Sequence, residues 1–313
     1  MIKIFSTAEN NTLKELDTIE PGAWVHLLDP TEAEVVFVRD TLHIEDEFIR
    51  AALDSEETVR IDAEDDQTLV LVDIPVVTPE RNSFVYTTLP MGIIITAENI
   101  ITVCLEETSI LEDFWNQNIR GGFDTCKKTR FLLQILYKNA SKYLQYLRQI
   151  DKASTQVENA LHQSMKNSEL IQMLKLEKSL VYFSTSLKSN EMVLEKMLRS
   201  KVIRSYPDDM DLLEDVIVEN KQAIEMGTIY RDILSGTMDA FASVISNNLN
   251  IVMKILTSLT IIIAIPSLFA ALWGMNVGGI PFATDPFGFW WVIAVAIAGT
   301  GIAVYFLWKK KMF

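Results

Sequence analysis

The chain has 313 residues, of which 49% are hydrophobic, and a formal net charge of −14. Residues 251–313 hold four Lys and one Asp (+3), which leaves −17 for residues 1–250. This acidic part would repel nucleic acid, which excludes a nucleic-acid-binding function; it either attracts cations or serves only solubility. Two Cys and three scattered His give no zinc-site spacing, and we expect no disulfide.

Residues 1–126 are predicted to form a cytosolic α/β domain. The N-terminus has no basic segment followed by an apolar core, so we expect no signal peptide and a cytosolic location for the first 250 residues. Thr31 and Glu34 form a capping-box pattern that opens a helix. Runs rich in β-branched residues predict a largely antiparallel sheet. Pro75 and Pro90 make their two strands poor candidates for uninterrupted central positions.

Residues 127–205 are predicted to form an antiparallel helical pair, with the break at Asn167 and Ser168. The Glu-x-x-His spacing of a metal-binding bundle is missing. Residues 206–250 are predicted to form a stalk helix that starts at Tyr206 and Pro207. Its apolar residues continue at three- and four-residue spacing: Leu212, Val216, Ala223, Met226, Tyr230, Ile233, Ala240 and Val244.

One helix from Asp208 to Trp273 would be about 100 Å long. Its stripe would be exposed in a monomer, which predicts a parallel homo-oligomer whose stalks surround one axis.

The last 63 residues predict two membrane-spanning helices, at 251–273 and 287–308, joined by an outer loop at 274–286 and followed by a basic tail at 309–313. The stretch 255–273 has no charge and covers roughly the 30 Å hydrocarbon core of a bilayer. Lys254 and Lys309–Lys311 flank the pair, whereas the loop contains only Asp285. The positive-inside rule therefore places both ends of the pair in the cytoplasm.

Small and polar residues recur along one face of the first span: Asn250, Met253, Thr257, Thr260, Ala264, Ser267, Ala271 and Gly274. Such a stripe either lines a pore or packs closely against copies of the same helix. No nucleophile–base set, phosphate loop or catalytic metal cluster is present, so we expect no enzyme. A tether for an ion sensor or scaffold is the competing class, although a tether has no use for the stripe.

The motif Gly274-Met275-Asn276 at the outer end of the first span resembles that of the CorA family of divalent cation transporters. The residues WVHLLDPTEAE (24–34) and ISNNLNIVMKILT (245–257) are also similar to that family, as is the basic tail. The resemblance covers the whole chain. It implies an α+β cytosolic domain, long stalk helices, two C-terminal transmembrane helices and a homopentamer with a central pore.

The resemblance also implies roles for individual residues. Gly274, Met275 and Asn276 match the outer selectivity motif, where amide and carbonyl oxygens meet a hydrated ion. Asp215 matches a residue that shares a regulatory Mg²⁺ with a neighbouring subunit, with Glu80 or Asp73 as the partner; a solvated stalk charge is the alternative for Asp215. The implied pore-lining residues are Asn250, Met253, Leu256, Thr260, Ala264, Ser267 and Ala271, of which Met253 and Leu256 form the hydrophobic constriction.

The implied function is channel-like transport of divalent cations across the cytoplasmic (inner) membrane, with Mg²⁺ as the main expected substrate. Mg²⁺ is then both substrate and regulatory ligand, and we expect no other cofactor. The expected partners are further copies of the chain, the bilayer and divalent cations. After the motif, residues 277–281 resemble the zinc-transporting, ZntB-like branch, so Zn²⁺, Co²⁺ and Ni²⁺ stay open as substrates.

Overall fold

The computed structural model describes residues 1–8, 12–80, 83–116, 119, 122–164, 167–199, 207–281, 285–310 and 312. The chain divides into two compact units, Met1–Gly236 and Thr237–Phe313. Helix α6 (Pro207–Trp273) supplies its first part to one unit and its remainder to the other. Tyr206 at the predicted stalk start, Lys311 in the predicted basic tail and residues 282–284 of the predicted outer loop lie outside the described residues.

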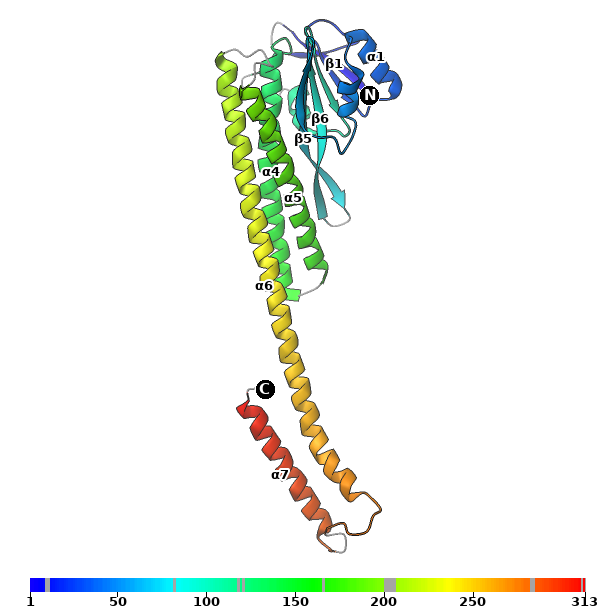
Figure 1. Cartoon of the computed structure of the whole chain (residues 1–313), viewed down its shortest axis with the longest axis vertical. Coiled ribbons are helices and arrows are strands. Elements are labelled where there is room, and N and C mark those ends of the chain that lie inside the picture. Colours follow the sequence, from blue (N-terminus) through cyan, green and yellow to red (C-terminus); the bar gives the residue numbers. More distant parts are fainter. Residues whose placement is uncertain are drawn as a thin grey trace. The chain divides into compact units, whose positions relative to one another are not determined.

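Within its described residues, the first unit contains one seven-stranded sheet (Figure 1). The strand order is β2-β1-β3-β7-β6-β5-β4, and every neighbouring pair is antiparallel except β3 and β7, which confirms the largely antiparallel prediction. The strands are β1 (Ile2–Thr7), β2 (Leu13–Leu16), β3 (Trp24–Leu28), β4 (Arg60–Glu64), β5 (Gln67–Glu80), β6 (Ser83–Ile95) and β7 (Ile100–Cys104). Strand β2, whose four residues include Lys14 and Glu15, was not predicted from the sequence.

Pro75 and Pro90 were expected to make their strands poor candidates for uninterrupted central positions, and the pairing of these strands agrees. β5 and β6 both have two neighbours in the sheet. However, β4 pairs only with residues 67–71 of β5, and β7 pairs only with residues 91–95 of β6. Each proline therefore lies where its strand has a single partner, so the missing N–H interrupts no ladder on the other side.

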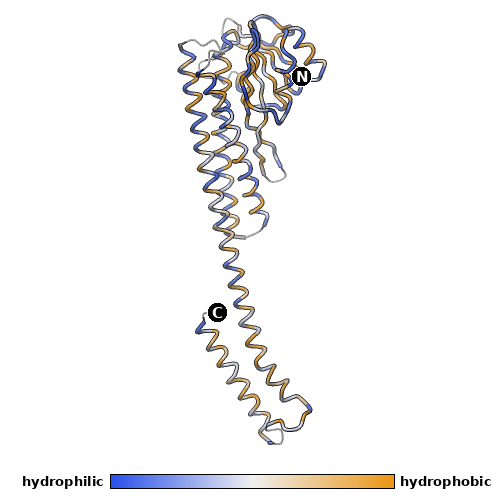
Figure 2. The backbone as a smooth tube through the Cα atoms, viewed as in Figure 1, coloured by the Kyte–Doolittle hydropathy of each residue, from blue (hydrophilic) through white to orange (hydrophobic). Residues whose placement is uncertain are grey.

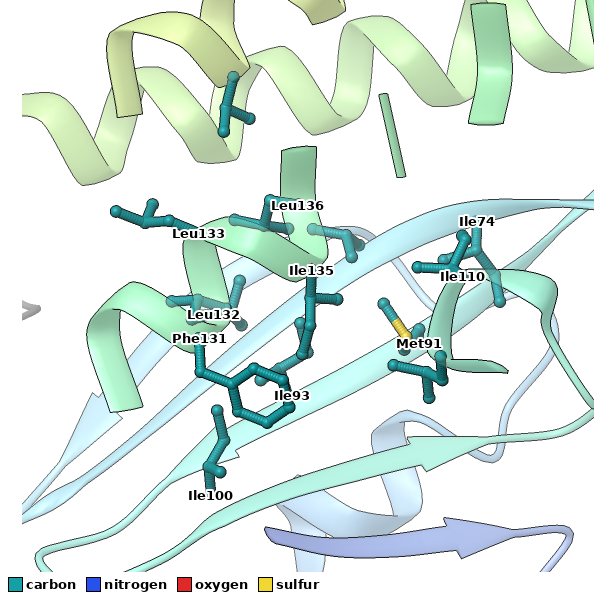
Figure 3. Packing of buried hydrophobic residues seen from close by; sticks show 14 of the residues in the cluster. Ile74, Met91, Ile93, Ile100, Ile110, Phe131, Leu132, Leu133, Ile135 and Leu136 are labelled. Carbon is teal, nitrogen blue, oxygen red and sulfur yellow. The ribbon is translucent and has the colours of Figure 1, made fainter. Parts of the chain in front are cut away.

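Helices cover both faces of the sheet. Alternate strand residues point to opposite sides, and both sets contain apolar residues that pack against helices. Leu69 and Leu71 of β5 pack with α1 (Glu32–Leu42) and α2 (Asp46–Ala51) in one buried cluster. Val70 and Val72 belong to the second cluster, with α3 (Ser109–Trp115), α4 (Lys128–Ser164), α5 (Asn167–Arg199) and the start of α6. Figure 3 shows this second cluster, in which Phe131 and Ile135 of α4 lie over Ile93 of β6. Helix α3 was not predicted from the sequence.

The local signals at helix starts agree with the structure in two cases. The Glu34 carboxylate accepts a hydrogen bond of 2.8 Å from the backbone N–H of Thr31, as the capping-box pattern predicts. Helix α5 begins at Asn167, where the sequence predicted the break between two long helices. Helices α4 and α5 run side by side as a hairpin (Figure 1).

The prediction that the stalk stripe is exposed in a single chain is wrong for its first part. Val216 and Ala223 are buried, and Leu212, Met226 and Tyr230 are half-buried. The reason is that α4 and α5 pack against this part of α6: a Cβ on Gly227 would lie 3.6 Å from Leu147 and 3.3 Å from Ser184. The later stripe residues Ile233, Ala240 and Val244 are exposed, so only they support the argument for an oligomer.

The second unit contains the end of α6 and helix α7 (Gly288–Lys309). Among the described residues, Asp208–Trp273 and Gly288–Lys309 are long and apolar enough to cross a membrane. Figure 2 shows hydrophobic residues along both helices in this part of the chain. Very little of either apolar stretch is buried within the chain. Lipid or further copies of the protein would cover the exposed apolar surface.

Candidate functional site

The small and polar stripe of α6 lies on the face turned away from α7. Between Ser258 and Trp273, the α6 residues other than Pro266 that are buried or half-buried recur at a different phase of the helix: Ser258, Ile261, Ile262, Ile265, Phe269 and Trp273. Two of them, Ile265 and Phe269, lie against Gly299 of α7. At 100° per residue, the centre of the stripe is rotated by roughly 145° from this buried face.

All predicted pore-lining residues are exposed in the single chain: Asn250, Met253, Leu256, Thr260, Ala264, Ser267 and Ala271. Met253 and Leu256 are 56% and 58% exposed. An exposed face that combines hydroxyls, small side chains and two large apolar residues is unlike a uniform lipid-facing surface. Packing within the chain therefore does not account for the stripe.

Two of the three hydroxyls of the stripe, those of Thr260 and Ser267, are oriented by the helix itself. Thr260 Oγ1 donates to the carbonyl of Leu256 at 2.8 Å, and Ser267 Oγ donates to the carbonyl of Ile263 at 2.8 Å. Since each proton is used within the helix, the remaining lone pairs act as acceptors. Oxygen acceptors on an exposed face suit the water molecules of a hydrated cation.

The motif Gly274-Met275-Asn276 begins where α6 ends. Gly274 N–H donates to the carbonyl of Ala270 at 3.0 Å, and the three motif residues are all exposed. The indole N–H of Trp273 donates to the carbonyl of Pro281 at 3.0 Å, so the intervening residues form a closed loop. Gly279 in this loop has φ of +92°, a conformation that L side chains rarely adopt. The motif is thus presented on a short loop tied at both ends.

The three predicted regulatory residues do not come together within one chain. Asp215 is exposed on α6. Glu80, at the end of β5, forms an ion pair with Lys175 of α5. Asp73 is half-buried and lies seven residues before Glu80 on the same strand, about 23 Å away at roughly 3.3 Å per residue. Asp73 and Glu80 cannot therefore share one ion, and among the described residues no group of three or more His, Cys, Asp or Glu could hold a metal.

Asp73 is held by a polar cluster between β5 and the long helices. Its backbone N–H donates to Asn190 Oδ1 at 2.9 Å, and Asn190 Nδ2 donates back to the Asp73 carbonyl at 2.8 Å. The same carbonyl accepts from Asn139 Nδ2 at 2.9 Å and from the Tyr143 hydroxyl at 3.2 Å. Burial raises the pKa of the Asp73 carboxyl, while a hydrogen bond from Ser186 opposes this shift. Such burial favours a structural role for Asp73 and makes it the weaker candidate for a shared ion site.

Sequence reasoning missed two contacts that shape the outer loop. One is the bond between Trp273 and Pro281, which no local motif signals. The other is at the start of α7, where the Asp285 carboxylate accepts from the backbone N–H of Phe287 at 2.9 Å. Asp285 lies three residues before α7 begins, and the N-cap residue is Phe287, so the capping rule does not signal this second contact.

A large α+β unit followed by two membrane-length helices, with an exposed polar stripe on the first, defines an integral membrane protein. The model of the CorA-like Mg²⁺ transporter protein family matches residues 21–311. The chain belongs to this family. The resemblance stated from the motif is therefore confirmed.

Comparison with individual proteins agrees. The cobalt/magnesium transport protein CorA of Methanocaldococcus jannaschii is 26% identical over 320 residues, which cover 97% of this chain and 98% of that protein. The complete structure of the CorA magnesium transporter from the same organism superposes with a TM-score of 0.83 and 25% identity, covering 98% of this chain and 96% of that one.

A second similar structure is the cytoplasmic domain of ZntB from Vibrio parahaemolyticus. Its TM-score is 0.59 at 14% identity, and the match covers 79% of this chain and 96% of that one. This likeness concerns the fold alone, so it adds nothing to the zinc alternative raised by the outer loop.

Proposed function

We propose that the chain forms a channel-like transporter of divalent cations, with Mg²⁺ as its main substrate. The observation that carries this proposal is the exposed stripe of α6, which faces away from α7 and ends at the motif containing Asn276. Relatives named as cobalt/magnesium transport proteins support the substrate class. Neutral amide and carbonyl oxygens at the mouth would bind a hydrated ion without the cost of removing its water.

A single chain does not enclose a pore, because the stripe is open on one helix. The proposed transporter is a homopentamer in which the stripes of five α6 helices surround one axis. Its setting is the cytoplasmic membrane, with both termini in the cytoplasm, as the flanking Lys residues indicate. In this assembly Met253 and Leu256 form a hydrophobic constriction near the inner end. The family consists of transporters, and we assign no enzymatic activity and no resident cofactor.

Cytosolic Mg²⁺ is also the proposed regulator. Residues 1–250 carry −17, so acidic surfaces brought together in an oligomer repel one another. A divalent cation near Asp215 would reduce this repulsion and favour the closed arrangement. Asp215 is exposed and continuous in one helix with Met253. Such an ion acts only through a higher affinity for the closed state than for the open one. Glu80 and Asp73 remain the two candidates for the partner, although each is engaged within its own chain.

Two alternatives are kept. The loop at 277–281 favours a ZntB-like transporter of Zn²⁺, Co²⁺ or Ni²⁺. The other alternative is a membrane-tethered ion sensor or scaffold. Such a protein needs no open pathway and therefore would not require the exposed hydroxyls of the α6 stripe.

Uptake by purified protein in liposomes tests these possibilities. Wild-type protein should admit Mg²⁺ in preference to Zn²⁺, Co²⁺ and Ni²⁺. Asn276→Ala should lose that preference while the oligomer still assembles. Wild-type flux and ion preference in Asn276→Ala would overturn the role of Asn276, and the absence of flux for all four ions would favour the sensor or scaffold.

A further inference from the structure

We infer that Trp273 is a positioning residue for the selectivity motif, and that its indole N–H fixes the loop containing Asn276 by holding the carbonyl of Pro281. The inference rests on the proposed function, since it assigns a device that places Asn276. Trp273 is the last residue of α6 and directly precedes Gly274. The bond from its Nε1 to the Pro281 oxygen measures 3.0 Å and joins the two ends of a nine-residue segment.

The loop has little else to hold its shape. Across the described residues 274–281, the one hydrogen bond other than that from Trp273 joins Gly274 to α6. A Cβ at Gly278 or Gly279 would meet nothing within 4 Å, so this part of the loop is open. Closing a short segment removes many of the conformations open to a glycine-containing chain. Among the described residues, the Trp273 bond is therefore the one hydrogen bond that closes the segment containing Asn276.

The indole itself is attached to the helix pair. The Trp273 ring lies 6.2 Å from the Phe269 ring, centroid to centroid, at an interplanar angle of 45°. Phe269 in turn occupies the space beside Gly299 of α7, where a Cβ would lie 3.2 Å from its Cε2. Aromatic pairs at this separation attract each other, and an indole N–H at a membrane interface keeps one polar partner. The order of contacts from Gly299 through Phe269 and Trp273 to Pro281 places the loop relative to both helices.

Losing the indole N–H should loosen the loop without unfolding the helix pair. Asn276 would then occupy several positions, and a ring of such residues would bind the hydrated ion less well. One neutral hydrogen bond corresponds to roughly a three- to tenfold change in an equilibrium constant. The apparent KM for Mg²⁺ should rise by about this factor, whereas the maximal flux should stay within about twofold, since no group along the stripe has changed.

The test compares Trp273→Phe, which keeps an aromatic ring but lacks the donor, with Trp290→Phe. Trp290 is an exposed indole at the start of α7 that takes no part in the loop bond. Full-length protein is reconstituted in liposomes, and Mg²⁺ uptake is measured as KM and maximal flux. Only Trp273→Phe should raise KM. An unchanged KM, or a parallel loss of flux and of assembled oligomer, would overturn the inference.

Hydrogen exchange of residues 277–280 in nanodiscs gives a second readout that does not depend on transport. Exchange should be faster in Trp273→Phe and unchanged in Trp290→Phe; equal exchange in Trp273→Phe and wild type would overturn the inference. Asn276→Ala distinguishes a failure of the positioning role of Trp273 from a failure of the proposed selectivity motif. If Asn276→Ala alters ion preference and Trp273→Phe does not alter KM, only the positioning role fails. If Asn276→Ala leaves preference unchanged, the proposed selectivity motif fails, and exchange still decides whether Trp273 restrains the loop.

Discussion

Gly299 of α7 faces Phe269 of α6 so closely that a Cβ on the glycine would lie 3.2 Å from the Phe269 ring. By contrast, a Cβ on Gly301 would meet nothing within 4 Å. We therefore expect Gly299→Leu to force the two helices apart, at a cost of about 1–3 kcal/mol, and Gly301→Leu to be tolerated. The apparent Tm in detergent measures this difference. Equal Tm values for the two variants would show that the contact does not limit helix packing.

The Asn190 amide and the Asp73 backbone bind each other through two hydrogen bonds, of 2.9 Å and 2.8 Å. Asn190→Ala leaves the Asp73 N–H without this partner and should lower the free energy of unfolding of the first unit by about 1–3 kcal/mol. Lys188→Ala, at an exposed position of the same helix, should change it little. Urea unfolding followed by circular dichroism compares the two, and similar midpoints would contradict a structural role for this cluster.

His26 should make the first unit less stable in acid. Thr102 Oγ1 accepts from Trp24 Nε1 at 2.8 Å and lies 2.9 Å from His26 Nδ1, so the threonine proton is directed at a neutral imidazole. Burial, followed by the charge of Lys3, lowers the pKa of His26 from 6.5 to about 4.

The unfolded chain therefore binds more protons between these two pH values, and stability falls as the pH drops from about 6.5 to about 4, by at most about 3 kcal/mol. His26→Gln should flatten this dependence relative to wild type. His43→Asn, at an exposed position with φ of 53° that Asn tolerates, serves as the control. A wild-type pH profile of unfolding in His26→Gln would contradict the assignment.

Cytosolic Mg²⁺ should protect the oligomer from proteolysis through Asp215. Asp215→Lys places a fixed positive charge at the exposed position and should weaken this protection, because the cation is then repelled. Glu214→Lys, which changes the neighbouring exposed residue of α6 by the same charge, controls for net charge. Equal loss of protection in both variants would indicate a general effect of the acidic surface and no specific site.

The fold was predictable where the periodicity was strong. The two spans follow from uncharged stretches of bilayer length, and Thr31 and Glu34 mark the start of α1 by side-chain chemistry. Strand β2 was not predictable in this way, because a short polar edge strand has no hydrophobic pattern. The location of Pro75 and Pro90 where their strands have a single partner depends on how far the neighbouring strands extend, which is a tertiary property.

The candidate site was likewise predictable where it depends on helical spacing and not where it depends on tertiary contacts. Helical spacing identified the stripe from Asn250 to Ala271, and the structure adds that this stripe faces away from α7. The bond between Trp273 and Pro281 depends on a loop conformation that no local rule encodes. The burial of Val216 and Ala223 depends on long-range packing with α4 and α5, which residue spacing alone does not reveal.

Thiol accessibility tests most directly whether the stripe of α6 lines a water-filled pathway. Cys126 is exposed and Cys104 is buried, so Cys126→Ser provides a background in which single cysteines are introduced. At Thr260 or Ser267 a cysteine should react with a charged, water-soluble thiol reagent, and the reaction should block Mg²⁺ flux in liposomes. At Ile262 or Ile265, on the face toward α7, neither effect should occur. Reaction and block at Ile262 and Ile265, with none at Thr260 and Ser267, would contradict the account.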